Sequence, residues 1–162
     1  MSEAPTFQAR NPDYEARVRD SFARQTFMRT IGATLETVAP GRVEMALPYR
    51  EDLCQQHGYF HGGVIGTLAD NAGGYAAFSL MAAEDSVLTV EYKMNIVSPG
   101  AGARLVAVGE VIRPGRSITV SDVKVYAEHA DGTRKLCATA LCTLMTMAGM
   151  SDEKQAHDPN VG

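Results

Sequence analysis

Residues 55–71 read QQHGYFHGGVIGTLADN, a glycine-rich turn that runs into an apolar segment. From Val64 to about Met81, small and apolar residues recur at helical spacing, so we predict a buried central helix. Glycines at the entry of that helix expose backbone N–H groups at the positive end of the helix dipole. Such groups can stabilise a developing negative oxygen, and Asp70, inside the helix, can supply a base or a nucleophile.

The segments around this helix predict the rest of the fold. Asn11-Pro12-Asp13 begins an amphipathic helix that closes near Gly32, and the alternating segments 34–38 and 42–47 form a hairpin across Pro40-Gly41. Four long strands follow the central helix, at 87–97, 104–113, 117–128 and 134–147. Short connections favour antiparallel neighbours, so we expect an α+β fold in which a curved antiparallel β-sheet wraps around the long central helix.

Length and composition indicate one soluble globular domain. The chain has 162 residues, of which 45% are hydrophobic and 21% charged, and its net charge is −4. We expect a flexible N-terminus over residues 1–10, a folded domain over 11–148 and a disordered tail over 149–162. No basic block and no bilayer-length apolar run is present, so we expect a cytoplasmic protein that binds neither nucleic acid nor membranes.

The cysteines and histidines do not form a recognisable metal or disulfide pattern. Three cysteines without C-x-x-C spacing suggest packing roles, with a nucleophilic Cys54 as the minor alternative. His57 and His61 are four residues apart, but the glycines around them argue against the continuous helix of a His-x-x-x-His zinc site. We therefore expect no metal.

One face of the central helix carries almost no bulk, since it consists of Gly66, Asp70, Gly73, Gly74 and Ala77. Glycines within a helix cost about 1 kcal/mol each, so this face requires a packing or functional reason, such as the close approach of a backbone or a ligand.

Asp70 could be a structural acid that pairs with Lys93. A buried carboxylate without a partner is expensive, however, and its pKa rises toward a useful range, which favours a catalytic role. Asn71 points elsewhere on the helix, and we expect it to serve packing or an interface.

The order of these elements, with His61-Gly62-Gly63 at the helix entry and Asp70 inside the helix, resembles the hotdog-fold acyl-CoA thioesterases, especially the phenylacetyl-CoA thioesterase (PaaI-like) branch. The resemblance spans about Leu35 to Met147. It also includes Gln55, six residues before the histidine, and Thr89, a hydroxyl residue at the start of the next strand.

The resemblance implies a role for each matching residue. The Gly62 N–H would polarise the thioester carbonyl, beside Gly63, and Gln55 would assist or orient the substrate. Asp70 would attack the carbonyl or activate a water that Thr89 positions, and both routes are open. His61 is either a general base or, as we favour, a residue that fixes the turn by hydrogen bonding.

The remaining predictions concern the substrate. Arg113-Pro114-Gly115-Arg116 aligns with a family loop that contacts coenzyme A near its phosphates, although two arginines in a turn can also be a solvated hairpin tip. Tyr59 could line the acyl pocket or fill the core, whereas we expect Phe60 in the core. Coenzyme A is part of the substrate, and no separate cofactor is expected.

The family also implies a homodimer, assembled further as a dimer of dimers, in which the turn comes from one subunit and the acid from the other. A helix rises 1.5 Å per residue, so Asp70 lies roughly 10 Å from the Gly62 donor, too far to hold one carbonyl within a subunit. Two alternatives remain: a non-catalytic acyl-CoA-binding module, and an enoyl-CoA hydratase or dehydratase on the same fold. The sequence leaves the acyl group open.

Overall fold

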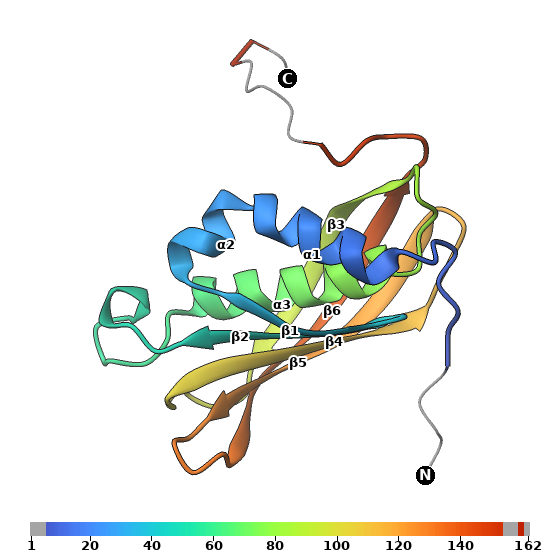
Figure 1. Cartoon of the computed structure of the whole chain (residues 1–162). Coiled ribbons are helices and arrows are strands. Elements are labelled where there is room, and N and C mark those ends of the chain that lie inside the picture. Colours follow the sequence, from blue (N-terminus) through green and yellow to red (C-terminus); the bar gives the residue numbers. More distant parts are fainter. Residues whose placement is uncertain (1–5, 154–158, 161–162) are drawn as a thin grey trace.

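The fold is a six-stranded antiparallel sheet that curves around one long helix (Figure 1). The computed structural model describes residues 6–153 and 159–160. The strands lie in the order β1-β2-β4-β5-β6-β3. Their bounds are β1 Thr34–Ala39, β2 Arg42–Pro48, β3 Ser86–Ile96, β4 Arg104–Arg113, β5 Ile118–Glu128 and β6 Arg134–Met147.

The helices lie together on one side of the sheet. The central helix α3 (Gly62–Phe78) packs against the sheet, and α1 (Tyr14–Arg24) and α2 (Thr26–Ile31) lie over it (Figure 1). A single 3-10 turn, η1 (Glu51–Leu53), precedes the glycine-rich turn. The predicted α+β hotdog architecture is confirmed, as are the hairpin and the four long strands.

The sheet departs from the expected order at one place. β3 and β4 are joined by a short connection, yet they are not neighbours, because β3 pairs with β6 at one edge and β4 pairs with β2 and β5. The expectation that short connections join neighbouring strands therefore fails here. The consequence for the site is that β3, which follows α3, lies at an open edge of the sheet.

The N-terminal helix is interrupted, so the prediction of one helix up to Gly32 is wrong. Gln25 has extended backbone angles (φ −73°, ψ 98°), and its N–H donates to the Phe22 carbonyl to close α1. Its side-chain amide donates to the Tyr75 hydroxyl on α3, a tertiary contact that sequence periodicity does not reveal. The predicted end at Gly32 is confirmed, since this residue has the positive φ of 82° that favours glycine in a helix cap.

The bare face of α3 serves mainly to bring the helix close to its own sheet. A Cβ added to Gly73 would lie 3.0 Å from Val123 and 3.1 Å from the Cys142 sulfur. On the facing strand, a Cβ added to Gly109 would lie 2.3 Å from the Ala72 carbonyl oxygen. This part of the face is therefore filled by the chain itself and not left open to a ligand.

Parts of both predicted tails lie against the folded domain. Phe7 packs on the core, and Gly149–Glu153 returns from β6 toward α1, where Arg24 donates to the Asp152 carboxylate at 2.9 Å. The rest of these segments, residues 1–5, 154–158 and 161–162, lies outside the described residues.

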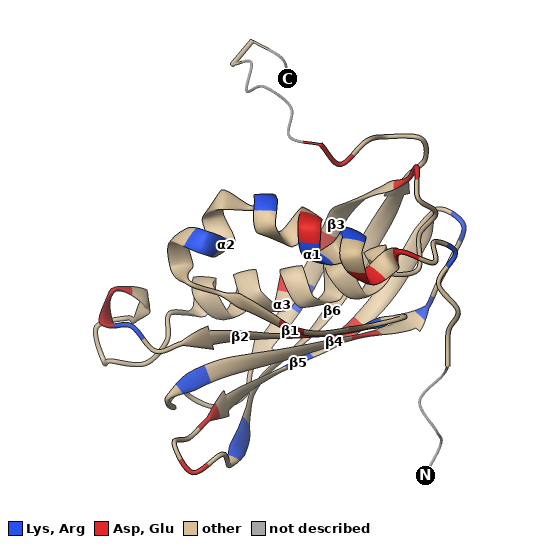
Figure 2. Cartoon of the chain, viewed as in Figure 1, with Lys and Arg blue, Asp and Glu red and all other residues tan. Residues whose placement is uncertain are grey.

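Charged residues are spread over α1 and the strand ends, whereas α3 contains one, Asp70 (Figure 2). In the part of the chain that the structure describes, none of the helices combines the length and apolar character needed to cross a bilayer.

Candidate active site

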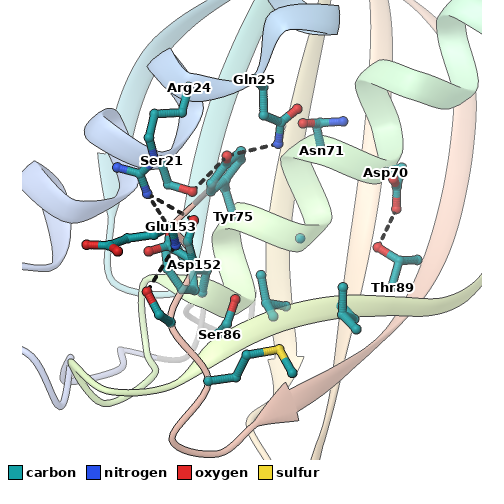
Figure 3. Close-up of a pocket in the computed structure, with 16 residues that line it drawn as sticks. Ser21, Arg24, Gln25, Asp70, Asn71, Tyr75, Ser86, Thr89, Asp152 and Glu153 are labelled. Atoms are coloured by element: carbon teal, nitrogen blue, oxygen red, sulfur yellow. Dashed lines mark hydrogen bonds and ion pairs between the residues drawn. The ribbon is translucent and has the colours of Figure 1, made fainter. Parts of the chain in front are cut away.

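The Asp70 carboxylate and the Thr89 hydroxyl meet between α3 and β3. Thr89 Oγ1 donates to Asp70 Oδ1 at 2.8 Å, as Figure 3 shows. Asp70 does not pair with Lys93, because no cation among the described residues forms an ion pair with this carboxylate. The acid is therefore held by a single neutral donor.

Burial changes the acidity of Asp70. Desolvation raises the pKa of the carboxyl group above its ordinary value, and the Thr89 hydrogen bond partly opposes that rise. A carboxylate with a raised pKa is a better proton acceptor than an ordinary one, which suits a general base.

A cavity of about 530 Å³ opens beside this pair (Figure 3). α3 and the start of β3 form its walls, and α1 and residues 150–153 cover it. Its apolar lining includes Phe78, Val87, Leu88 and Met150. The cavity has the size and lining of a small-molecule site next to a carboxylate.

The helix entry is organised by His61. Its Nδ1 accepts the Gly63 N–H at 2.9 Å, so the ring caps the helix and fixes the turn, the role we favoured for this residue. The cap occupies the Gly63 donor. By contrast, the Gly62 N–H has no acceptor among the described residues. The donor that the family resemblance points to is therefore free.

A second cavity, of about 390 Å³, adjoins this donor. Gln55, Tyr59 and Gly62 line it together with Ile96–Gly100. The Gln55 side-chain oxygen accepts the His57 N–H, and the side-chain N–H groups of Gln55 have no acceptor within the described parts of the chain. Tyr59 is 40% exposed in this cavity, whereas Phe60 is 2% exposed, which confirms Phe60 as a core residue.

The candidate residues thus fall into two groups within one chain. The two cavities share no lining residue, and the acid and the free donor lie eight residues apart on α3, about 12 Å along the axis. Neither group alone provides both a base and an oxyanion donor for one carbonyl.

The arginine loop lies away from both groups. Arg113 and Arg116 are exposed, and among the described residues neither forms an ion pair or a side-chain hydrogen bond. The turn requires glycine at position 115, because a Cβ there would lie 2.0 Å from the Ile118 carbonyl oxygen. The loop presents two unpaired cations to solvent.

The cysteines are not placed for catalysis. Cys142 packs beneath α3 near Asp70, and burial raises the pKa of its thiol to about 12, so it stays protonated at neutral pH. The Cys54 thiol donates to the Arg50 carbonyl oxygen at 3.3 Å. Among the described residues, no group of three or more His, Cys, Asp or Glu could hold a metal ion.

Several residues of the larger cavity were not assigned to the site from the sequence. Asn71 was expected to face packing or an interface, but it lines the cavity beside Asp70, as do Tyr75, Ser21 and Gln25. The four-residue spacing of Asn71 and Tyr75 on α3 could have revealed their common side. Ser21 of α1 and Gln25, which directly follows α1, reach the cavity only because α1 docks on α3, and this docking leaves no local signal in the sequence.

A curved sheet wrapped around a central helix, with a carboxylate at the middle of that helix and a capped glycine turn at its entry, is the hotdog arrangement that the sequence resemblance implies. The thioesterase superfamily model matches residues 57–132, the segment that contains Gly62, Asp70 and Thr89. The chain is 49% identical to a thioesterase family protein from Silicibacter pomeroyi, whose crystal structure superposes with a TM-score of 0.82 over 84% of this chain and 99% of that one.

Two further comparisons also match thioesterase-type proteins, one in sequence and one in fold. The chain is 30% identical to the 1,4-dihydroxy-2-naphthoyl-CoA hydrolase of Listeria monocytogenes, over 71% of this chain and 90% of that protein. The PaaI protein of E. coli has the same fold, with a TM-score of 0.75 at 17% identity over 87% of this chain and 98% of that one. The chain belongs to the thioesterase superfamily and is a thioester hydrolase.

Proposed function

We propose that this thioesterase hydrolyses acyl- or aroyl-coenzyme A to the carboxylic acid and free coenzyme A. The observation that carries the proposal is the Asp70 carboxylate, which has a raised pKa and a single hydroxyl donor at the wall of a cavity of about 530 Å³. The 1,4-dihydroxy-2-naphthoyl-CoA hydrolase among the relatives supports coenzyme A as the thiol.

The chemistry follows from the groups present. Asp70 takes a proton from water, whose oxygen attacks the thioester carbon, and the carbonyl oxygen becomes an oxyanion that accepts the Gly62 N–H. Collapse of this intermediate breaks the C–S bond, and the thiolate takes the proton held by Asp70. Thr89, which donates to one carboxylate oxygen, orients the acid so that the other oxygen faces the water.

Asp70→Asn tests the base. The change keeps the shape of the side chain but removes the proton acceptor, so we expect release of free thiol to fall at least about a hundredfold. Asp122→Asn is the matched control, because Asp122 pairs with Lys124 on β5 instead of lining the cavity. Unchanged thiol release by Asp70→Asn would refute the role of this acid.

Single turnover in heavy-oxygen water separates general-base catalysis from direct attack by Asp70, since label enters the Asp70 carboxylate only if the acid attacks directly.

We also propose that each site is completed by a second copy of the chain. β3 lies at the sheet edge with exposed apolar side chains at Leu88, Val90, Tyr92 and Ile96. An open edge of this kind favours pairing with another strand, and a twofold axis there would bring the partner's free Gly62 N–H toward Asp70. We further propose that two such dimers pair into a tetramer, as the family resemblance implies.

Subunit mixing tests the shared site. Asp70→Asn and Gln55→Ala should each be weakly active alone, whereas a mixed dimer contains one site with both an intact acid and an intact glutamine. Random mixing of equal amounts makes half of the dimers mixed, so about a quarter of the parent activity should return. If mixing restores nothing, the acid and the turn act within one subunit.

We propose that Arg113 and Arg116 bind the coenzyme A phosphates, which is supported by their exposure and by their lack of partners in the described chain. Arg113→Ala and Arg116→Ala should raise KM for an acyl-CoA but leave turnover of the matching S-acyl-N-acetylcysteamine unchanged, because that thioester lacks the nucleotide. Arg29→Ala, another exposed arginine, is the control. Equal effects on both thioesters would contradict phosphate binding.

A further inference from the structure

Tyr92 of β3 lies between the two separated groups of candidate residues. A Cβ added to Gly66 would lie 3.0 Å from the Tyr92 hydroxyl oxygen, so this hydroxyl reaches α3 at the level of Gly66. Gly66 is four residues after Gly62 and four residues before Asp70, about 6 Å along the helix axis from each. Tyr92 is 44% exposed, and its hydroxyl forms no hydrogen bond with the described parts of the chain. The level midway between the acid and the donor therefore carries a tyrosine that its own chain leaves half exposed.

A β-bulge explains why Tyr92 and Thr89 face the same way although they are three residues apart. The register with β6 shifts between Thr89 and Glu91, so Val90 has no partner in β6. A bulge of this kind changes which face of the sheet the following side chains take. Tyr92 therefore points toward α3, as Thr89 does. Side chains alternate along a strand, so its neighbours Glu91 and Lys93 point to the outer face of the sheet.

Glu91 and Lys93 are exposed charges of opposite sign that the chain does not pair. Glu91 accepts the Thr143 hydroxyl at 3.3 Å, but among the described residues neither Glu91 nor Lys93 forms an ion pair. β3 is an edge strand, so the side of this stretch that faces away from β6 is open. A strand that carries complementary charges would fit this edge.

Twofold symmetry fixes the place of the axis if that strand is β3 of a second copy. The partner's Gly62 can reach Asp70 only if both α3 helices lie on the same side of the joined sheet, which makes the two β3 strands antiparallel. By the same symmetry Gly62 meets the partner's Asp70. The axis therefore passes midway between positions 62 and 70, at the level of Gly66, and Tyr92 is the β3 residue that comes nearest to Gly66.

The charges on the outer face select the same axis independently. In an antiparallel pair centred on residue 92, positions 91 and 93 lie opposite each other, so Glu91 meets the partner's Lys93, and the same contact forms a second time across the axis. An axis through residue 91 would oppose two glutamates, and an axis through residue 93 would oppose two lysines. Opposite charges directly across two strands stabilise the pair and like charges destabilise it. The helix geometry and the charge pattern thus agree on Tyr92.

We propose that Tyr92 lies on the twofold axis of the dimer and that Glu91 and Lys93 pair across it, so that this part of β3 sets the register in which the partner's Gly62 N–H reaches Asp70. The inference rests on the proposed shared site and names the residues that align its two halves. The two Tyr92 side chains meet between the α3 helices, where one hydroxyl can donate to the other. Tyr92, Glu91 and Lys93 are positioning residues, because they touch the second copy and not the thioester.

Charge reversal tests the register. Glu91→Lys alone opposes two lysines at each crossing and Lys93→Glu alone opposes two glutamates, so each variant should raise the dissociation constant of the dimer by at least roughly tenfold in sedimentation experiments. An equal mixture of the two variants meets opposite charges at both crossings. We therefore expect the mixture to recover the parent dissociation constant and, because the acid and the donor are intact in both chains, the parent rate of thiol release. Lys135→Glu, an exposed lysine beyond the part of β6 that pairs with β3, is the control.

The outcomes of this experiment are distinct. A parent-like dissociation constant in both single variants, or a mixture that associates no more tightly than either variant alone, would overturn the proposed register. Failure of the proposed function looks different, because the parent would then release no thiol although sedimentation still reports the dimer and its response to charge.

Cross-linking tests the position of Tyr92. A residue on the axis lies opposite its own copy with Cα atoms about 4.5–5.5 Å apart, which is within the range of a disulfide. Tyr92→Cys should therefore give a covalent dimer on oxidation, seen on a non-reducing gel. Met94→Cys should not, because roughly 13 Å of strand separates the two copies of position 94 in this register. Both variants carry Cys54→Ser, since Cys54 is the native thiol that is not buried. No covalent dimer from Tyr92→Cys, or one that forms equally fast from Met94→Cys, would overturn the proposal.

Discussion

Replacing Gly109 by alanine should separate α3 from the sheet. The added Cβ would lie 2.3 Å from the Ala72 carbonyl oxygen, 2.5 Å from its carbon and 2.8 Å from the Gly73 nitrogen, whereas ordinary contact begins near 3.4 Å. The helix must therefore retreat by about 1 Å, the difference between 3.4 and 2.3 Å. The obstacle is backbone and cannot rotate away, so we expect a loss in the free energy of unfolding of about 3 kcal/mol, the upper end for overpacking.

The same displacement should also slow hydrolysis, because Ala72 is two residues from Asp70 on one rigid helix. A shift of about 1 Å at a catalytic group can cost about a hundredfold in rate. Urea unfolding followed by circular dichroism measures the stability, and thiol release measures the rate. Gly74→Ala is the matched control for stability. Its Cβ would lie 4.0 Å from the Leu144 side chain, so we expect helix propensity to stabilise this variant by about 1 kcal/mol. If Gly109→Ala unfolds at the parent urea concentration, α3 does not pack as closely on β4 as these distances imply.

Three further changes have expected signs. The raised pKa of Asp70 means that its ionisation opposes folding, an effect absent below the ordinary pKa of Asp and complete above the raised one. Asp70→Asn should therefore raise Tm at neutral pH and change it little in acid, and a lower Tm at neutral pH in calorimetry would contradict this. Thr89→Val removes the hydrogen bond that lowers the same pKa, so the acidic limb of the pH–rate profile should move to higher pH, and a shift to lower pH would argue against the contact. Val90→Lys puts a positive charge on the exposed edge strand of both copies, so we expect monomers in size-exclusion chromatography and little turnover; an active dimer would exclude pairing through β3.

The parts of the fold that depend on local pattern could be predicted from the sequence. Residues 62–78 are helical because small and apolar residues repeat at helical spacing, and Gly32 ends α2 because its positive φ favours glycine. The place of β3 at the sheet edge could not be read in this way, since its pairing with β6 joins segments far apart in the chain. The break at Gln25 escaped for a similar reason, because it accompanies a side-chain bond to Tyr75.

The same distinction between local pattern and distant contacts applies to the candidate site. Asp70 stands out as the one charged residue of an apolar helix, and the family resemblance pointed to Thr89, which the structure brings within 2.8 Å of it. The part of the cavity lining next to α1 could not be predicted, because Ser21 and Gln25 reach the cavity only through the docking of α1 onto α3. Asn71 was placed elsewhere because neighbouring positions on a helix diverge by about 100°, yet a cavity of this width spans both directions.

The cavity is built from separate stretches of the sequence, because α1 and the segment after β6 form its cover whereas α3 and β3 form its walls. Asp70 and Thr89 lie within the segment shared with the superfamily, residues 57–132, whereas Ser21, Gln25 and Asp152 lie outside it. Substitutions in these outer stretches of the chain can therefore change the shape of the cavity cover and leave the Asp70–Thr89 pair unaltered.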